Sequence, residues 1–347
     1  MNVVSLYASA WQRLQQWRPK LPHALLLTGA RGLGKRELAY AFAAGLLCEQ
    51  PRPDGLACQA CLACRWFSQG HHPDFRLLEP EAHKLDAEGE GSGSDKGADK
   101  AKRSGQQITI EQVRELDAYL SVGTHRQGLR IICITPAECL NRSAANALLK
   151  MLEEPPAGTL FLLLTSEPMR LLPTLRSRCQ TLGLSPPAAE LAVQVLERAG
   201  VQDAQTWLAL AGGAPVLARE LALEGGDEWL DALLESLALG PRLEVMATAA
   251  ALEKRLKAVK GANPLPRLVD WGQKWLVDLG LVGAGGAVRF YLGRRATLTS
   301  LAKRTSLPKT VRFYRYLVKL RQDSEHPLNM RLFLEQFLFH YRALFVE

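Results

Sequence analysis

Two groups of residues near the start of the chain have the types and the spacing that chemistry requires. In the first, Gly29, Gly34 and Lys35 fill the phosphate-loop pattern G-x-x-x-x-G-K-[ST]. Glycines in such a loop let backbone N–H groups surround a phosphate, and the lysine adds a positive charge. The hydroxyl that should bind magnesium is absent, because Arg36 takes its place. The sequence leaves open whether ATP or ADP binds here; the candidate residues are Gly29, Gly32, Gly34 and Lys35.

The second group is a set of four cysteines within residues 48–64, with the spacing C-x9-C-x2-C-x2-C. This spacing is typical of a site in which four thiolates surround a zinc ion. Disulfides or unpaired cysteines are the alternatives, and the N-terminal residues lack the secretion signal that would favour disulfides. Because four protein ligands leave no open coordination position, we expect a structural zinc ion. The expected ligands are Cys48, Cys58, Cys61 and Cys64.

The composition is that of an ordinary globular protein. Of the 347 residues, 47% are hydrophobic and 22% are charged, and the length favours two or three domains. No run of eighteen uncharged apolar residues occurs, so we expect a cytoplasmic protein without membrane contact. The formal net charge of +8 permits contact with nucleic acid but equally suits a protein with one basic face.

Alternating strands and helices are expected to position both groups. The strand that leads into the phosphate loop is followed by further short apolar runs, each separated by an amphipathic segment. The expected strands are 129–135 and 159–166, and the expected helices are 108–122, 141–154 and 171–179. Thr109 is a suitable N-cap for the first of these helices. This order predicts an α/β fold with a doubly wound parallel sheet in residues 1–186.

The rest of the sequence contains a polar insertion and a helical second half. Residues 84–107 contain no aromatic and almost no large aliphatic residue, so we interpret them as a disordered insertion. Helical periodicity then dominates, which predicts a small helical domain at 187–227 and a larger all-α domain at 228–347. In the larger domain, Trp271 and Trp275 lie four residues apart, and we expect both of them in its core.

Six motifs, taken in their order along the chain, point to a family. They are "HALLLTGARGLGK", the four-cysteine segment, "HPDF", "NALLKMLEEPP", "TLRSRC" and "LNMRLFLEQFLFHY". In this order the chain resembles the delta-prime subunits of the bacterial DNA polymerase III clamp loader, which are members of the AAA+ class. The resemblance implies an AAA+ phosphate-loop domain with a zinc module, followed by a helical lid domain and an all-α collar domain.

The same resemblance implies a role in DNA replication. Clamp loaders are five-subunit machines that open a ring-shaped sliding clamp and place it on primed DNA. The implied partners are the tau or gamma ATPase subunits, the delta subunit, the clamp and, through the complex, primed DNA. The whole assembly is part of a DNA polymerase holoenzyme, which is a nucleotidyltransferase.

The resemblance also implies roles for single residues. By similarity to the SRC motif, Arg178 is an arginine finger that acts in trans on a nucleotide held by a neighbouring subunit, and a helix cap or salt bridge is its alternative role. The second core strand is followed by Thr135 and Pro136 where ATPases carry Asp-Glu, and we expect Glu138 to point elsewhere. Val216 stands where related subunits carry a sensor arginine. We therefore expect no ATP hydrolysis by this chain.

Two rival functions fit parts of the sequence. An autonomous AAA+ ATPase is opposed by the missing hydroxyl, carboxylates and sensor arginine. A zinc-containing nucleic-acid-binding protein is opposed by the scarcity of basic residues in the cysteine segment, where Arg52 stands alone between Cys48 and Cys64. If the chain contacts DNA, we expect helix N-termini such as the start of "NRSAANALLK" to bind phosphates.

Overall fold

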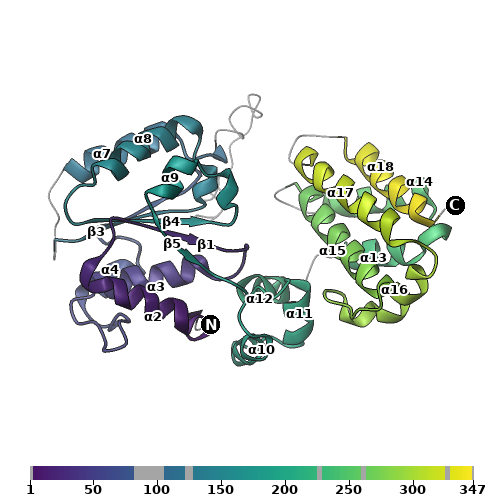
Figure 1. The fold of residues 1–347 in the computed structure, drawn as a ribbon, viewed down its shortest axis with the longest axis horizontal. Coiled ribbons are helices and arrows are strands. Elements are labelled where there is room, and N and C mark those ends of the chain that lie inside the picture. The colour runs from purple at the N-terminus through teal and green to yellow at the C-terminus, as the bar shows by residue number, and fades with distance from the viewer. Residues whose placement is uncertain are drawn as a thin grey trace. The chain divides into compact units, whose positions relative to one another are not determined.

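A computed structural model describes residues 3–81, 105–121, 128–224, 229–258, 263–324 and 329–345. The chain forms two compact units, Met1–Leu191 and Ala192–Glu347 (Figure 1). Most of the insertion predicted at 84–107 lies outside the described residues. Within the described ranges, no helix is both long enough and apolar enough to cross a membrane.

The first unit is built on a five-stranded sheet in the order β2-β3-β4-β1-β5. Every neighbouring pair is parallel, and in the centre Leu26 of β1 lies opposite Leu163 of β4. The strands are β1 (Ala24–Thr28), β2 (Phe75–Leu78), β3 (Arg130–Ile134), β4 (Thr159–Thr165) and β5 (Gln180–Gly183). The structure confirms the predicted buried strands, which are β1, β3 and β4. The edge strands β2 and β5 have no such signal, because each contains four residues of which one is buried.

Helices cover both faces of this sheet, with α2, α3 and α4 on one face and α7, α8 and α9 on the other (Figure 1). The helices of this unit are α1 (Val3–Leu6), α2 (Ala8–Trp17), α3 (Lys35–Leu47), α4 (Leu62–Ser68), α7 (Ile110–Ser121), α8 (Arg142–Glu153) and α9 (Pro173–Ser177). Short 3-10 turns are η1 (Arg18–Lys20), η2 (Ala137–Cys139) and η3 (Pro168–Arg170). The predicted doubly wound α/β arrangement is confirmed.

Local caps explain where two of these helices begin. The helix α7 starts directly after Thr109, whose backbone N–H donates to Oε1 of Gln112 at 2.9 Å. The helix α8 starts after Asn141, whose side chain accepts the backbone N–H of Ala144 at 2.8 Å. Both helices then pack on the sheet through buried aliphatic residues such as Leu148. The caps fix where α7 and α8 begin, and their apolar faces hold both helices against the sheet.

The second unit is helical throughout its described residues. Its helices are α10 (Ala189–Arg198), which begins just before the unit boundary, α11 (Ala204–Leu210), α12 (Pro215–Leu223), α13 (Leu230–Ala238), α14 (Val245–Ala258), α15 (Leu265–Gly283), α16 (Arg295–Ala302), α17 (Leu307–Asp323) and α18 (Met330–Arg342). Short 3-10 turns are η4 (Gly240–Arg242), η5 (Leu292–Arg294) and η6 (Ala343–Phe345). Trp271 and Trp275 are buried, and Nε1 of Trp275 donates to the hydroxyl of Tyr341 at 3.0 Å. Their predicted core role is confirmed. The finer division of this unit at residue 227 stays a prediction.

Candidate functional site

The phosphate loop connects β1 to α3, and the backbone conformation and close packing of the loop require its glycines. Gly34 precedes α3 with a left-handed φ of 94°, a conformation that favours glycine. A Cβ atom on Gly29 would lie 2.6 Å from the carbonyl oxygen of Leu184, which follows β5. Gly32 also has a positive φ, of 76°. The fold therefore requires these glycines whether or not a phosphate binds.

Lys35 is bound by the protein rather than presented to solvent, with 8% of its surface exposed. Its Nζ donates to the carbonyl oxygens of Gly29 and Ala30 at 2.8 and 2.9 Å and to Oγ of Ser166 at 2.9 Å. An ammonium group has three protons to donate, so these bonds use its full capacity. Burial lowers the pKa of Lys35, while the nearby charge of Glu138 raises it. The lysine thus ties the loop to the end of β4.

Arg36 places a second positive charge where the magnesium-binding hydroxyl would stand. Its Nη1 lies 3.5 Å from Oε2 of Glu79, the residue that follows β2, and its guanidinium lies over the ring of Tyr40. Half of the Arg36 side chain is exposed, whereas the side chain of Glu79 is largely buried. A divalent cation brought to this position would meet a like charge that is already paired with the neighbouring carboxylate.

The end of β3 carries the residues expected there, but Glu138 departs from expectation. Thr135 and Pro136 follow the strand, so this position offers no carboxylate. We expected Glu138 to point elsewhere; instead its Oε1 accepts the backbone N–H of Ser166 at 3.1 Å, beside Lys35. The reason is the turn η2, which packs back against β4. An acidic side chain therefore lies near the loop, although not at the position that ATPases use.

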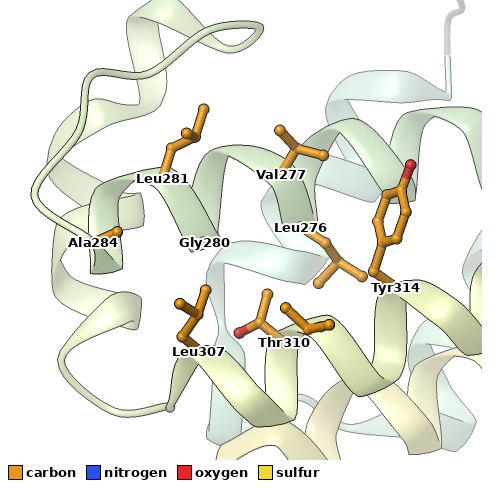
Figure 2. Close-up of a pocket in the computed structure, with 9 residues that line it drawn as sticks. Leu276, Val277, Gly280, Leu281, Ala284, Leu307, Thr310 and Tyr314 are labelled. Carbon is orange, nitrogen blue, oxygen red and sulfur yellow. The ribbon is translucent and has the colours of Figure 1, made fainter.

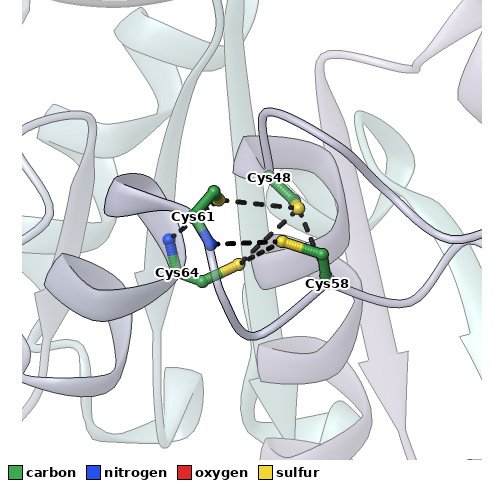
Figure 3. Close-up of side chains that lie close together, drawn as sticks. All are labelled: Cys48, Cys58, Cys61 and Cys64. Atoms are coloured by element: carbon green, nitrogen blue, oxygen red, sulfur yellow. Dashed lines mark hydrogen bonds between the residues drawn. The ribbon is translucent and has the colours of Figure 1, made fainter.

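The four cysteines converge on one point between α3 and α4, as Figure 3 shows. All four sulfur atoms lie within 4.8 Å of one another. The Sγ atom of Cys48 is 3.9 Å from that of Cys61 and 3.6 Å from that of Cys64, and Cys58 and Cys64 are 3.8 Å apart. Thiolates arranged as a tetrahedron about 2.3 Å from zinc have sulfur atoms about 3.8 Å apart. The spacing therefore matches a four-thiolate zinc site.

Backbone N–H groups around these sulfur atoms favour negative charge on part of the cluster. The N–H groups of Ala60 and Cys61 donate to Sγ of Cys58 at 3.4 and 3.3 Å and lower the pKa of that thiol. Burial instead raises the pKa of Cys64. Such N–H groups stabilise thiolates, which are the form of cysteine that binds metal ions.

Arg178 lies directly after α9 in the first unit, with about a third of its side chain exposed. Its Nη2 is 2.5 Å from Oε1 of Glu153, the last residue of α8, and its Nη1 donates to the carbonyl oxygen of Thr174 at 3.0 Å. Arg176 makes a different contact, from Nη1 to Sδ of Met169 at 3.5 Å. The two arginines of the "TLRSRC" segment therefore lie in different surroundings.

Sequence reasoning missed the partners of these residues. Glu79, Ser166 and Glu153 are distant in the sequence from the side chains that they bind, and Glu79 follows a strand that has no clear sequence signal. A signal was available for Glu153, because it belongs to the "LEEPP" segment already noted as a motif. Val216, which stands where related subunits carry a sensor arginine, lies at the start of α12 and supplies no charge.

Comparisons with known proteins give consistent similarities. A family described as "DNA polymerase III, delta subunit" matches residues 8–188. The chain is 32% identical to the DNA polymerase III subunit delta' of Pseudomonas aeruginosa, over 94% of each chain. It is 39% identical to the subunit of the same name from Escherichia coli over 60% of this chain and 56% of that one. A crystal structure of a gamma subunit-related DNA polymerase III protein from Thermotoga maritima covers 96% of this chain and 99% of its own, with 20% identity and a TM-score of 0.44.

Proposed function

The chain belongs to the delta-prime family of DNA polymerase III subunits, and from this premise we propose that it is a clamp-loader subunit that does not hydrolyse ATP. In this proposal it supplies Arg178 to the nucleotide of a neighbouring ATPase subunit. The assembly contains tau or gamma subunits and a delta subunit, and it loads the sliding clamp onto primed DNA.

The observation that carries the proposal is the placement of Arg178. The guanidinium is partly exposed and is held by one surface carboxylate, that of Glu153, of which half is exposed, and by the carbonyl oxygen of Thr174. Surface ion pairs of this kind contribute about 0–1 kcal/mol. An arginine finger that reaches the phosphates of a nucleotide accelerates hydrolysis by roughly a factor of 10³–10⁵. The free energy needed to release Arg178 is therefore small compared with what it supplies to the transition state.

Three features of the phosphate loop and of the end of β3 support the absence of hydrolysis. Arg36 replaces the metal-binding hydroxyl, Thr135 and Pro136 replace the carboxylates, and Lys35 is occupied by carbonyl oxygens and Ser166. Loss of one preorganised group typically costs about 3–4 kcal/mol of transition-state stabilisation. With several such groups missing, hydrolysis by this chain is effectively lost. We infer that the main role of Lys35 and the loop glycines is to stabilise the fold, and that the role of this chain in the loader does not require nucleotide binding.

The cysteine cluster supports a structural zinc ion. Cys48 directly follows α3, Cys64 lies in α4, and Cys58 and Cys61 lie in the segment that leads into α4, so a bound ion would join the ends of these two helices. Four thiolates would complete its coordination, which leaves the ion no position for a substrate. The metal would therefore stabilise a local loop and take no part in phosphate chemistry.

One observation favours the rival ATPase function, namely the position of Glu138 near Lys35. We rank this rival second, because one oxygen of Glu138 is bound to a backbone N–H and the other is buried. Steady-state ATP turnover by the isolated chain separates the two functions. We expect no turnover from the isolated chain, and we expect DNA- and clamp-stimulated turnover by its partner subunits to rise when the chain is added. Turnover by the isolated chain that Glu138→Gln abolishes would favour the rival.

A further inference from the structure

The positive charge of the chain is concentrated in one segment of the second unit. Residues 279–322 contain ten lysine or arginine residues and no aspartate or glutamate, whereas the formal net charge of the whole chain is +8. This segment covers the end of α15, all of α16 and all but the last residue of α17. The basic character of the protein, which the composition alone does not place, therefore belongs to the surface of these helices.

Three of these basic residues form a stripe along α17. Arg312, Arg315 and Lys319 are exposed, and their spacing of three and four residues places them on one side of the helix. Within the described ranges, none of the three is paired with a carboxylate. Asp323, at the C-terminal end of α17, is the first acidic residue on this side. Exposed like charges without a partner in the protein attract an external anion.

The basic stripe is a different surface from the apolar groove between α15 and α17 that Figure 2 shows. From α17, that groove is lined by Leu307, Thr310, Val311 and Tyr314. Because a helix has about 3.6 residues per turn, Arg312 and Lys319 lie about a quarter of a turn around α17 from Val311. An anion bound to the stripe therefore needs none of the groove residues.

Aromatic side chains of α17 and α18 lie beside the stripe. Tyr316, one turn after Arg312, stacks on the ring of His340, with centroids 4.2 Å apart and planes at 10°. His340 is exposed, which leaves the other face of its ring accessible. Phe339 is 44% exposed, and the guanidinium of Arg342 lies 5.5 Å from the centre of its ring. Exposed rings beside basic side chains are the combination that binds unpaired bases together with their phosphates.

The length of the stripe fits several phosphates of one strand. Seven residues of helix rise about 10.5 Å, and phosphates along one strand of a nucleic acid follow one another about every 3.4 Å. The distance from Arg312 to Lys319 therefore suits about three phosphates. An acidic peptide would pair with the same charges but offers no planar bases to His340 and Phe339. The aromatic rings thus favour a single-stranded nucleic acid.

We propose that α17 and α18 form a binding site for single-stranded DNA. Arg312, Arg315 and Lys319 contact its phosphates, and an unpaired base stacks on His340. The contact has no sequence preference, because neither phosphate charge nor stacking reads the base edges. The choice of DNA over RNA rests on the proposed function in replication. The inference goes beyond that function, in which the chain meets primed DNA through the complex, because it assigns this chain a direct contact with an unpaired strand.

Fluorescence anisotropy of a labelled oligodeoxythymidine with the isolated full chain, at pH 8 and over a range of salt concentrations, tests the site. Neutralising the stripe with Arg312→Gln, Arg315→Gln and Lys319→Gln should weaken binding by roughly tenfold or more. The slope of log K against log salt should fall by about 2, since each phosphate contact on a single strand contributes about 0.7. His340→Ala should weaken binding by roughly fivefold with the slope unchanged, because stacking involves no counterion release.

The matched control removes the same net charge elsewhere, with Arg198→Gln, Lys254→Gln and Arg255→Gln on exposed positions of α10 and α14. It should keep most of the affinity, and thermal melting should be unchanged in both triple variants.

Three results would overturn the DNA site. They are an unmodified chain that leaves the oligonucleotide free at low salt, a stripe variant that binds as tightly as the control, and tighter binding of polyglutamate than of the oligonucleotide. None of them bears on the proposed function, because the measurement uses the isolated chain. Failure of the chain to join a loader would instead overturn the proposed function and leave the DNA contact standing.

Discussion

Nη2 of Arg178 lies 2.5 Å from Oε1 of Glu153, so an ion pair joins the end of α8 to the turn after α9. The pair connects the "LLKMLEEPP" and "TLRSRC" segments, which are separate motifs in the sequence. In the proposed function, Glu153 holds the guanidinium while no neighbouring nucleotide is in reach. A triphosphate offers several anionic oxygens and can replace a single carboxylate.

The first prediction concerns this carboxylate. Glu153→Gln should lower the free energy of unfolding by at most about 1 kcal/mol, because an exposed ion pair contributes little. The ATPase rate of the assembled loader should stay the same or rise, since Arg178 loses only its ion pair and keeps the hydrogen bond to Thr174. Urea denaturation and ATPase assays measure the two effects. If the ATPase rate fell as far as we expect for Arg178→Ala, Glu153 would be needed to orient the arginine.

The second prediction concerns Lys35, which we assign a structural role. Lys35→Ala should lower the free energy of unfolding by about 1–3 kcal/mol in buffer without nucleotide, because carbonyl oxygens in the loop lose their donor. Lys150→Ala, on an exposed position of α8, is the control and should be nearly neutral. Chemical denaturation of both variants gives the comparison. A stability equal to that of the unmodified chain would show that Lys35 is kept for a ligand instead.

A third prediction concerns the pH dependence of stability. Burial lowers the pKa of Lys274 to about 8, while its Nζ donates to the carbonyl oxygen of Leu210 at 2.8 Å and lies over the ring of Trp271. Between pH 8 and about 10.4 this lysine is mostly neutral when folded and charged when unfolded, so the unfolded state binds more protons. The contribution of Lys274 to stability should therefore rise with pH across this range.

Urea denaturation of the unmodified chain and of Lys274→Met, from pH 7 to 10.4, tests this sign. The difference in unfolding free energy should shift in favour of the unmodified chain as the pH rises, because methionine does not titrate. A difference that stays constant, or shifts toward the methionine variant, would mean that the carbonyl and ring contacts keep Lys274 charged.

The fourth prediction concerns the metal. The purified chain should contain one zinc ion, and Cys61→Ser should reduce that content and loosen the segment 48–64 while the sheet stays folded. The effect is local because the ligands span only this segment and the adjoining ends of α3 and α4. Cys139→Ser removes a thiol outside the cluster and should leave the zinc content unchanged. Elemental analysis showing well under one zinc per chain would exclude the assignment.

The parts of the structure that could be predicted depend on local pattern. The buried strands β1, β3 and β4 are continuous apolar runs, and the four cysteines lie within seventeen residues, so spacing alone indicates their convergence. The edge strands β2 and β5 are short and partly exposed and have no such pattern.

Contacts between distant residues could not be predicted in the same way. Ser166 binds Lys35 across 131 positions, and Glu79 binds Arg36 from the end of an unpredicted strand. Glu138 was expected to point elsewhere, and its actual direction could not be predicted because the direction of a side chain in a short turn depends on how the turn packs. These contacts follow from the order of the strands in the sheet. The order of the elements along the chain does not determine that order.

The most direct test of the central claim is the ATPase rate of a reconstituted loader that carries Arg178→Ala. We predict normal assembly and a loss of roughly 10³-fold in turnover at the one adjoining site, so that the total DNA- and clamp-stimulated rate falls by the share of that site. Arg178→Lys should restore little, because an ammonium group lacks the planar set of donors, and Arg176→Ala should have a milder effect on the rate. An Arg178→Ala loader that assembles normally and hydrolyses ATP at the unmodified rate would contradict the assignment of Arg178 as a finger acting in trans.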